Sequence, residues 1–470
     1  MSLKIAPGVL RWPFKGSSDV NRHCQNQERY LAELKDFLRI PSVSTDPAHT
    51  GDVRRAAEWV AADLRRSGLE RVEMVEAAGR HPLVYADWLH APGKPTLLLY
   101  GHYDVQPAEP LDEWISPPFE PTVRHENIYA RGAVDDKGQT LILLKALEGF
   151  LQTAGKLPVN IRVLIEGEEE VGGEHIEAFV TANPGRLAAD AALICDTEMF
   201  APDLPTICTG LRGIIYGELT VEGARTDLHS GVYGGAAPNA VEAAAQIIAS
   251  LKDRDGRILI PGLYDKVRPP SAAELAAWAQ LPFDEAEYLD KEIGASSLTG
   301  EPGLSVLERV WARPTLEVHG IRGGFTGEGA KTVIPARAVA KISLRLVADL
   351  DPAEVTRQVQ AAVAAATPRG IKARFETIQG GPPSMVDTSS PYIAAAARAL
   401  SETFGRETVY MRSGGSIPIV GLFQQHLHIP SVLMGFGLPD DNLHAPNEKF
   451  HLPNFYRGIE AVAHYLEVLG

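Results

Sequence analysis

The amino-acid sequence predicts an α/β fold in which helices flank a mostly parallel sheet and a smaller α+β domain is inserted. Three observations predict it. Apolar strands alternate with helices over the first 209 residues, which is typical of a parallel sheet covered on both faces. After about residue 208 the strands alternate polar and apolar residues, and a buried apolar strand returns at 429–437. A chain of 470 residues also exceeds one ordinary core, so two domains are expected.

The first domain is expected to be discontinuous, comprising residues 1–209 and 386–470. Residues 27–40 have helical periodicity, and residues 51–69 form an amphipathic helix with Gly68 as a left-handed cap. The remaining elements of this domain are expected as strands at 83–89, 96–105, 159–170, 191–198 and 429–437, and as helices at 141–151, 174–182 and 390–405.

The inserted domain is expected at 210–385. Its order of strand–helix–strand–strand–helix–strand is typical of a ferredoxin-like sandwich. Asp351, Pro352 and Glu354 form a capping-box signature at the start of its second long helix. A polar, proline-containing segment at 254–313 interrupts the order. The other elements are expected as strands at 214–224, 314–324 and 338–349 and as a helix at 238–253.

Charge and cysteine content exclude several classes of protein. The net charge is −15 and no basic run offsets it, which argues against nucleic acid or an anionic membrane as the main partner. The three cysteines are too few and too scattered for a disulfide framework, as is typical of a reducing compartment. The first residues lack the apolar core of a signal peptide, and no apolar run is long enough to span a bilayer. We therefore expect a cytoplasmic protein.

Polar clusters rich in histidine and carboxylate side chains follow the predicted apolar strands. Each cluster alone has an ordinary explanation, because paired aspartates cap helices and acidic runs or single histidines occur in solvated loops. The carboxyl ends of parallel strands, however, meet at one edge of a sheet. Divalent cations choose the ligand types that these clusters offer. The clusters are YGHYDVQP (100–107), RGAVDDKG (131–138), IEGEEEVGG (165–173), ICDTEMF (194–200) and NLHAPNE (442–448).

In this order the clusters resemble those of a dinuclear-metal peptidase family that includes aminoacylase, acetylornithine deacetylase, carboxypeptidase G and carnosinase. The resemblance covers nearly the whole chain, including the inserted domain, and implies two divalent metal ions per subunit, Zn²⁺ or Mn²⁺. It implies that Asp135 bridges the two ions and that its peptide bond to Asp136 is cis. The other implied ligands are His102 and Asp196 for one ion and Glu170 and His444 for the other.

The resemblance also implies the chemistry. Glu169 would be the general base, taking a proton from a water shared by the two ions and delivering it to the leaving amine. Asp104 lies two residues after His102 on the same strand face and would orient its imidazole. His229, in TDLHSGVYGGAAPN (226–239), resembles a histidine that enters the partner subunit's site in family dimers and would donate to the carbonyl oxygen. Its alternative is an ordinary loop histidine.

Five further residues resemble substrate-binding positions. Arg345, in ISLRLV, would grip a peptide's terminal carboxylate with two hydrogen bonds. An arginine between apolar residues of a strand is otherwise often a surface residue. The resemblance implies that the inserted domain is a lid and a dimerisation domain. The other four residues are Lys331 and Thr332 in GGFTGEGAKTVIP and Arg412 and Ser416 in RSGGSIP.

The DDK form of the bridging motif and the long segment at 254–313 are most similar to the carnosinase and cytosolic nonspecific dipeptidase branch. Gly173 stands where that branch often has serine, and His319 stands where relatives often lack histidine, so His319 receives no role. We expect a homodimeric metallo-dipeptidase that hydrolyses the peptide bond next to a free C-terminal carboxylate. Two alternatives remain open: an N-acyl amino acid deacylase with the same metal site, and a non-catalytic binding protein of the same fold.

Overall fold

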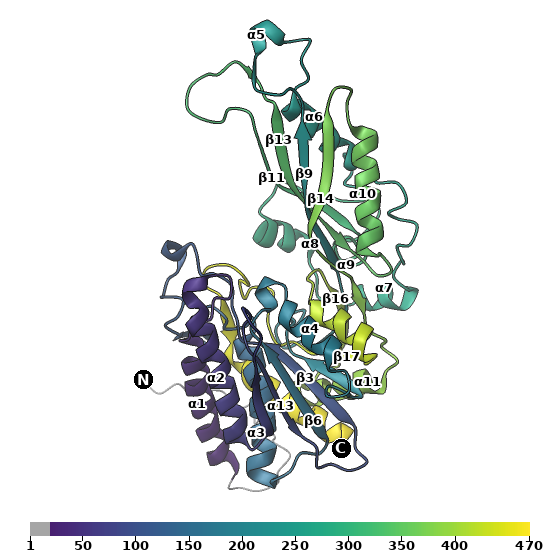
Figure 1. The fold of residues 1–470 in the computed structure, drawn as a ribbon. Coiled ribbons are helices and arrows are strands. Elements are labelled where there is room, and N and C mark those ends of the chain that lie inside the picture. Colours follow the sequence, from purple (N-terminus) through teal and green to yellow (C-terminus); the bar gives the residue numbers. More distant parts are fainter. Residues whose placement is uncertain (1–18) are drawn as a thin grey trace. The chain divides into compact units, whose positions relative to one another are not determined.

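The computed structural model describes residues 19–470 (Figure 1). The chain divides into two compact units. The first unit contains the residues up to Thr209 together with 386–411 and 422–470, and the second contains 210–385 and 412–421.

The segment 412–421 belongs to the second unit, whereas the sequence analysis included it in the first. Two of its side chains account for the difference. Arg412 forms an ion pair with Glu274, and Ser416 donates a hydrogen bond to the carbonyl of Arg212, both within the second unit. These partners lie far away in the sequence, so no local sequence pattern predicts the contacts.

A large mixed sheet forms the centre of the first unit, in the order β1-β2-β6-β3-β7-β17-β8. Its middle strands β6, β3, β7 and β17 run parallel, as the sequence predicted. The pairings toward both edges are antiparallel, because β1 and β2 form a hairpin and β8 returns beside β17. The bounds are β1 (Glu70–Val75), β2 (Leu83–Trp88), β3 (Thr96–His102), β6 (Asn160–Glu166), β7 (Ala191–Ile194), β8 (Thr206–Leu211) and β17 (Ser431–Leu433).

Helices flank this sheet (Figure 1). The helix α3 is buried on all sides from Lys137 to Phe150, because α1, α2 and α13 pack around it as well as the sheet. Gly68 ends α2 with φ of 98°, which confirms the predicted left-handed cap. The bounds are α1 (Asp19–Leu38), α2 (Thr50–Ser67), α3 (Lys137–Ala154), α4 (Glu174–Ala182), α11 (Pro391–Phe404) and α13 (Leu452–Leu469). A small separate sheet contains β4 (Thr122–Arg124), β5 (Asn127–Tyr129) and β18 (Lys449–His451).

The second unit contains a four-stranded antiparallel sheet in the order β11-β13-β9-β14. The strand and helix order is β9-α6-β11-β13-α10-β14, which confirms the ferredoxin-like arrangement. One face of the sheet packs on α6 and α10 and buries residues such as Ile215, Leu219, Ile342 and Leu344. The bounds are β9 (Gly213–Glu222), α6 (Ala240–Leu251), β11 (Thr315–Gly323), β13 (Arg337–Leu346), α10 (Pro352–Ala366) and β14 (Lys372–Gly381).

The segment 254–313 folds into the short helices α7 (Ala272–Trp278), α8 (Glu285–Glu287) and α9 (Val306–Ala312). Trp278 and Trp311 pack edge to face with ring centroids 5.1 Å apart. A separate difference concerns α10. Asp351 accepts from the backbone N–H of Glu354 as predicted, but the Glu354 carboxylate bonds Lys266 at 2.5 Å instead of returning to the cap. The predicted capping box is therefore only half formed.

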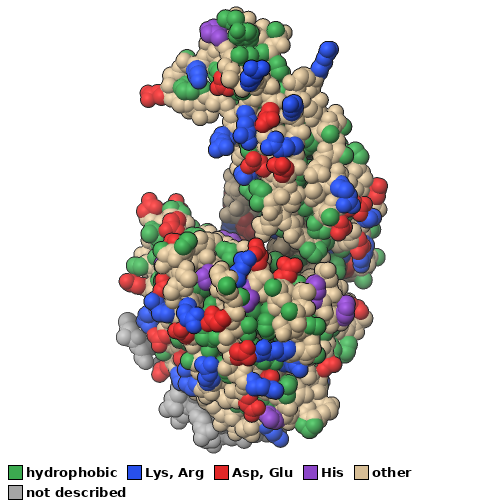
Figure 2. All heavy atoms as spheres, viewed as in Figure 1, with side chains coloured by type: hydrophobic (Ala, Val, Ile, Leu, Met, Phe, Trp, Pro, Cys, Tyr) green, Lys and Arg blue, Asp and Glu red, His purple; other side chains and the backbone are tan. Residues whose placement is uncertain are grey.

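Charged side chains of both signs are interspersed over the face drawn in Figure 2. That face shows no extended basic area of the kind that binds a nucleic-acid backbone. Across residues 19–470, no helix combines the length and the apolar character needed to cross a membrane.

Candidate metal centre

The carboxyl ends of the parallel strands in the first unit bring the predicted metal ligands together. His102 is the last residue of β3, and Asp196 lies two residues beyond β7. Asp135 lies in the turn that opens α3, and Glu170 lies in a short 3-10 turn after β6. His444 lies in the loop between β17 and β18. This placement is the one expected for a site in an open α/β sheet.

The ligand atoms form two groups that share Asp135. His102, Asp135 and Asp196 offer atoms that all lie within 4.8 Å of one another, and so do Asp135, Glu170 and His444. Oδ1 of Asp135 is 3.2 Å from Nε2 of His102, while Oδ2 is 2.9 Å from Nε2 of His444. Each carboxylate oxygen of Asp135 therefore faces a different histidine, which is the arrangement a bridging ligand needs.

The electrostatics of these groups fit bound cations. Burial first, and then the charge of Asp136, raises the pKa of Asp196 well above its ordinary value. Burial and the charge of Asp135 raise the pKa of Glu170 to about 7. Nε2 of His102 and Oε1 of Glu170 are buried and have no hydrogen-bond partner among the described residues. Crowded carboxylates and unpartnered imidazole nitrogen are the donors that Zn²⁺ and Mn²⁺ accept.

Asp104 connects the two groups from behind. Its Oδ1 lies 3.4 Å from Nδ1 of His102, and its carboxylate accepts from the backbone N–H groups of Glu169 at 3.3 Å and Glu170 at 3.1 Å. Ser44 donates a further hydrogen bond to Oδ2 at 2.7 Å. Asp104 is thus placed to orient the His102 ring and to hold the segment that carries the two glutamates.

The backbone around the shared aspartate has a special conformation. The Asp135–Asp136 peptide bond is cis, which confirms what the family resemblance implied. The Asp136 carboxylate points away from the shared position and accepts from the His102 N–H at 3.1 Å and the Thr140 hydroxyl at 2.7 Å. The two neighbouring aspartates therefore have different surroundings.

Glu448 is a buried residue that the sequence analysis quoted but did not single out. Its carboxylate accepts from Arg131 Nη1 at 2.7 Å and from the backbone N–H groups of Gly132 at 2.8 Å, Val134 at 3.0 Å and Asp135 at 3.2 Å. Since Glu448 follows His444 by four residues, one side chain fixes the loops of two candidate ligands. The only local feature that points to Glu448 is its position four residues after His444 in NLHAPNE.

The acidic run after β6 separates into different environments. Glu166 accepts from the Tyr100 hydroxyl at 2.6 Å, and Glu168 accepts from the backbone N–H groups of His81 and His175. Glu169 is partly buried, and its pKa is raised well above the ordinary value by loss of solvent contact and by the charge of Glu170. Glu169 therefore lies within electrostatic reach of the candidate ligands without belonging to either group.

The predicted substrate-binding residues lie in the second unit, in two places. Nη1 of Arg345 donates to the Ser416 hydroxyl at 3.1 Å. His229 is exposed in the short strand β10 (Leu228–His229), which pairs with β12 (Val333–Ile334), and Ser230 N–H donates to the Thr332 carbonyl at 3.1 Å. Lys331 lies near this second place, 5.9 Å above the Phe325 ring.

These two places lie at opposite ends of β13. Gly223 N–H bonds the Ala336 carbonyl just before β13 begins at Arg337, while Arg345 is its last but one residue. Eight residues of strand at about 3.3 Å each span ~26 Å. An extended dipeptide spans only about 7 Å. The backbone span between these two places is therefore several times the length of a dipeptide.

Arg412 has a different environment from Arg345. Its side chain is 4% exposed, its Nη2 lies 2.6 Å from the Glu274 carboxylate, and its guanidinium lies over the Trp278 ring. The structure thus joins Arg412 to α7. Its substrate-binding role stays a prediction.

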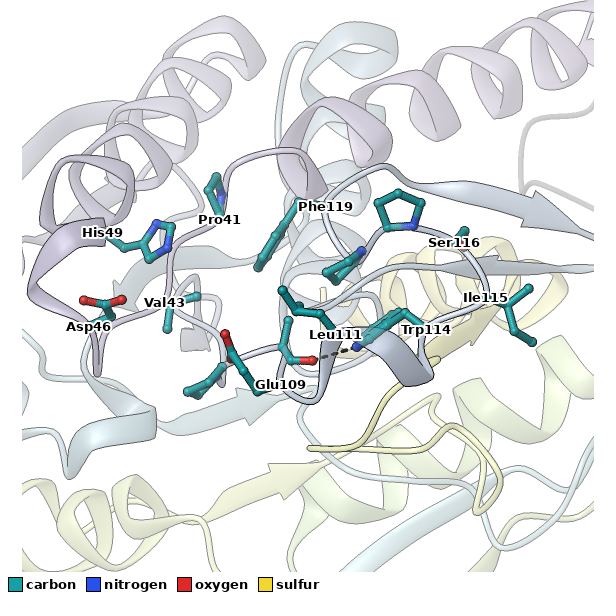
Figure 3. Close-up of a pocket in the computed structure, with 14 residues that line it drawn as sticks. Pro41, Val43, Asp46, His49, Glu109, Leu111, Trp114, Ile115, Ser116 and Phe119 are labelled. Carbon is teal, nitrogen blue, oxygen red and sulfur yellow. Dashed lines mark hydrogen bonds between the residues drawn. The ribbon is translucent and has the colours of Figure 1, made fainter.

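A separate hollow of about 690 Å³ opens on the first unit (Figure 3). Asp46 and His49 lie at one end and Trp114 and Ile115 at the other, with the Trp114 indole N–H donating to the Ala108 carbonyl at 2.7 Å. Most of its lining is proline and apolar side chain, and none of the candidate metal ligands lines it. The hollow is therefore distinct from the candidate metal centre.

Comparison with known proteins agrees with this centre. The pattern of peptidase family M20/M25/M40 matches residues 98–468. The chain is 32% identical to the Cys-Gly metallodipeptidase of Saccharomyces cerevisiae over 93% of this chain and 95% of that protein. It is 31% identical to the human Beta-Ala-His dipeptidase over 93% and 89% of the two chains. The crystal structure of human carnosine dipeptidase 1 superposes with a TM-score of 0.83 at 31% identity, covering 96% of this chain and 97% of that one. The chain therefore belongs to peptidase family M20/M25/M40, in the branch of these dipeptidases, and is a hydrolase that acts on peptide bonds.

Proposed function

We propose that this protein hydrolyses dipeptides at the bond next to a free C-terminal carboxylate, with two divalent cations bound in the first unit. The observation that carries the proposal is the pair of three-residue groups sharing Asp135, in a chain similar to named dipeptidases. His102 and Asp196 would complete one ion's ligands, and Glu170 and His444 the other's. The donor types suit Zn²⁺ or Mn²⁺.

The chain's own residues divide the remaining work. When bound, two such cations lower the pKa of a water and polarise the scissile carbonyl. Glu169 takes a proton from the attacking water and gives it to the leaving amine, a role that its partly buried position beside Glu170 and its raised pKa support. Asp104 holds His102 and the Glu169–Glu170 backbone in place for these steps.

Arg345 binds the substrate's terminal carboxylate in this proposal. The guanidinium bonds the Ser416 hydroxyl and forms no ion pair with any carboxylate among residues 19–470. A half-buried arginine without a counter-charge is suited to an incoming anion, and its planar fork matches a carboxylate. The proposal therefore predicts a strong preference for free acids over C-terminal amides.

The second unit would serve as lid and dimerisation domain, with His229 donating to the carbonyl oxygen in the partner subunit's site. The placement of His229 and Arg345 at opposite ends of β13 supports this, because the strand between them is several times the length of a dipeptide. The exposed position of His229 leaves its imidazole accessible to a second copy. A cytoplasmic location is also part of the proposal, supported by the small number of cysteines, of which Cys195 and Cys208 are buried.

A substrate panel tests the proposal. Metal-free protein would be supplemented with Zn²⁺ or Mn²⁺ and offered dipeptides, the same dipeptides as C-terminal amides, and N-acetyl amino acids. We expect metal-dependent hydrolysis of the free dipeptides above both other classes. Preferential hydrolysis of N-acetyl amino acids would establish the deacylase alternative instead. Metal binding without turnover of any substrate would favour a non-catalytic binding protein.

A further inference from the structure

Two arginines in the second unit, Arg212 and Arg345, are linked through one hydroxyl, and neither forms an ion pair with a described carboxylate. Arg345 donates to the Ser416 hydroxyl at 3.1 Å, and that hydroxyl donates to the main-chain carbonyl of Arg212. Among residues 19–470, neither Arg212 nor Arg345 forms an ion pair with an aspartate or glutamate. Arg412, three residues before Gly415 in strand β16 (Val409–Ser413), does have such a partner in Glu274. Arg212 and Arg345 therefore differ from the neighbouring Arg412 in having no ion-pair partner among the described residues.

Burial makes the absence of an ion pair costly for both guanidinium groups, and the charge of Glu317 offsets this cost only in part for Arg212. Burial first, and then the charge of Arg345, lowers the pKa of Arg212 to about 10. Burial likewise lowers the pKa of Arg345. Nη1 of Arg212 is shielded from solvent and has no hydrogen-bond partner in the described part of the chain. Two like charges held in this way favour a bound anion nearby.

Arg212 also builds the turn that presents Ser416. Its backbone N–H donates to the Gly415 carbonyl at 3.0 Å, and its Nε donates to the Gly414 carbonyl at 3.1 Å. The turn packs closely on the guanidinium, because a Cβ at Gly414 would lie 2.8 Å from Nη2 of Arg212. One residue thus fixes three consecutive positions, 414–416, through both its backbone and its side chain.

We propose that Arg212 is a positioning residue for the substrate's terminal carboxylate, holding the 414–416 turn so that Ser416 and Arg345 receive that carboxylate together. The inference rests on the proposed function, since it deepens the carboxylate site already assigned to Arg345. Arg345 makes the contact, and Arg212 acts through the turn and through its charge. No family motif quoted above contains Arg212, which lies between β8 and β9.

The test is a substrate-discrimination measurement on Arg212→Met in the full-length, metal-loaded protein. For a dipeptide with a free carboxylate, KM should rise by about 10-fold or more, the usual effect of losing a charge-assisted interaction, with a smaller change in kcat. For the same dipeptide as a C-terminal amide, kcat/KM should stay close to the wild-type value. The ratio of acid to amide kcat/KM should therefore fall.

A matched control separates positioning from general charge loss. Arg322→Met removes the same charge from an exposed position on β11 and should leave the ratio unchanged. If Arg212→Met lowers kcat/KM equally for acid and amide, or leaves KM of the acid unchanged, the inference is wrong. Arg212→Lys keeps the charge but loses the Nε bond to Gly414, so its ratio should lie between those of Arg212→Met and wild type. If Arg212→Met does not fold, a wild-type ratio in Arg212→Lys overturns the inference.

Measurements on the wild-type protein distinguish a failure of the proposed function from a failure of the role of Arg212. Equal hydrolysis of acids and amides by wild type would defeat the carboxylate site of the proposed function itself. Clear discrimination by wild type that persists in both Arg212 variants would leave the proposed function intact and defeat only the role of Arg212.

Discussion

Asp135 owes its orientation to residues that offer no atom to either candidate metal group. Glu448 accepts hydrogen bonds from the backbone N–H groups of Gly132, Val134 and Asp135 and from the Arg131 side chain, all at 2.7–3.2 Å. Asp104 does the same for the Glu169–Glu170 segment. Buried carboxylates that bind several N–H groups hold a loop rigidly, because moving the loop leaves each donor unpaired. Positioning and ligation are therefore divided between different carboxylates.

The first residue prediction concerns Glu169. Replacing it by alanine should lower turnover by roughly 10²–10⁴-fold, the usual contribution of a general base, while both ions remain bound. The expectation follows from its partly buried position beside Glu170, because Glu169 belongs to neither ligand group. Steady-state kinetics and elemental analysis of the purified variant check it, with exposed Glu177→Ala as control. Loss of both ions, or near-normal turnover, would show that the roles within EGEEE are wrong.

The second residue prediction concerns Glu448. In Glu448→Gln, an amide NH₂ group replaces one of the two carboxylate oxygens. This NH₂ cannot accept the hydrogen bonds that backbone N–H groups donate to that oxygen in the wild-type protein. Metal affinity should fall by about 10–100-fold, the usual cost of losing a residue that orients ligands. Titration of metal-free protein with Zn²⁺ measures this without any substrate. An affinity equal to that of exposed Glu120→Gln would mean that Glu448 does not position the ligands.

Sequence reasoning found the residues that belong to motifs and missed those that act through distant partners. The candidate ligands lie in short stretches whose order along the chain is distinctive. Arg212 and Glu274 lie in no such stretch. Arg212 bonds Gly414, 202 residues away in the sequence, and Glu274 bonds Arg412, 138 residues away. Only folding brings these groups together, so no local pattern contains the information.

At the scale of elements, a buried charge cluster joins α1, α2 and α3. Lys145 of α3 lies 2.7 Å from Glu33, 2.7 Å from Asp63 and 2.6 Å from Glu148, with Arg29 adding a further ion pair to Glu148. The three carboxylates have a spacing that could hold a metal ion. The lysine ammonium already supplies the positive charge at their centre, so the cluster fastens helices together and is not a second metal centre.

The helix α13 contains a buried carboxylate, Glu460, that the charge of Arg457 compensates only in part. Glu460 is 5% exposed, its Oε2 has no hydrogen-bond partner among the described residues, and burial raises its pKa to about 7. The folded state thus holds the proton more tightly than the unfolded state, whose pKa is the ordinary value near 4.5. Folding stability from this group is present at low pH and is lost as pH rises from about 4.5 through 7.

The prediction at this scale follows from the direction of this pH dependence. Glu460→Gln keeps the shape but cannot ionise, so it should stabilise the protein at pH 8 by at most about 3 kcal/mol and much less at pH 5. Denaturant unfolding of wild type and variant at both pH values measures the difference. Exposed Glu407→Gln should show no such pH-dependent gain. An equal effect of Glu460→Gln at both pH values would contradict the assigned ionisation.

Element bounds were largely predictable because periodicity and caps are local. The predicted helix at 51–69 corresponds to α2 (Thr50–Ser67), and the predicted strand at 338–349 corresponds to β13 (Arg337–Leu346). Strand direction at the sheet edges was not predictable. The strand β8 runs antiparallel to β17, and the whole inserted domain separates these two strands in the sequence. The capping box at Asp351 was half wrong because Lys266, a distant residue, takes the Glu354 carboxylate.

At the scale of the whole molecule, the second unit presents different chemistry at its two ends. One end contains Arg345, Ser416 and Arg212, and the other contains His229 with Thr332. About 26 Å of strand separates the two ends, which is several times the length of a dipeptide. A two-fold dimer would give each site one end from each chain, because a two-fold interface exchanges equivalent surfaces reciprocally.

The last prediction is that subunit mixing restores activity between two inactive variants. His229→Ala should lower kcat by about 10²–10³-fold, as expected for loss of a donor to the developing oxyanion. Glu169→Ala should be inactive for the separate reason given above. If His229 serves the partner's site, each heterodimer of the two variants contains one site with both substitutions and one with neither. Activity should therefore return once subunits exchange, in proportion to the heterodimer fraction measured by native mass spectrometry. If His229 acts only within its own chain, every site in the heterodimer carries one substitution and activity stays absent. Verified exchange without recovery would thus assign His229 to its own loop and remove the need for a dimer.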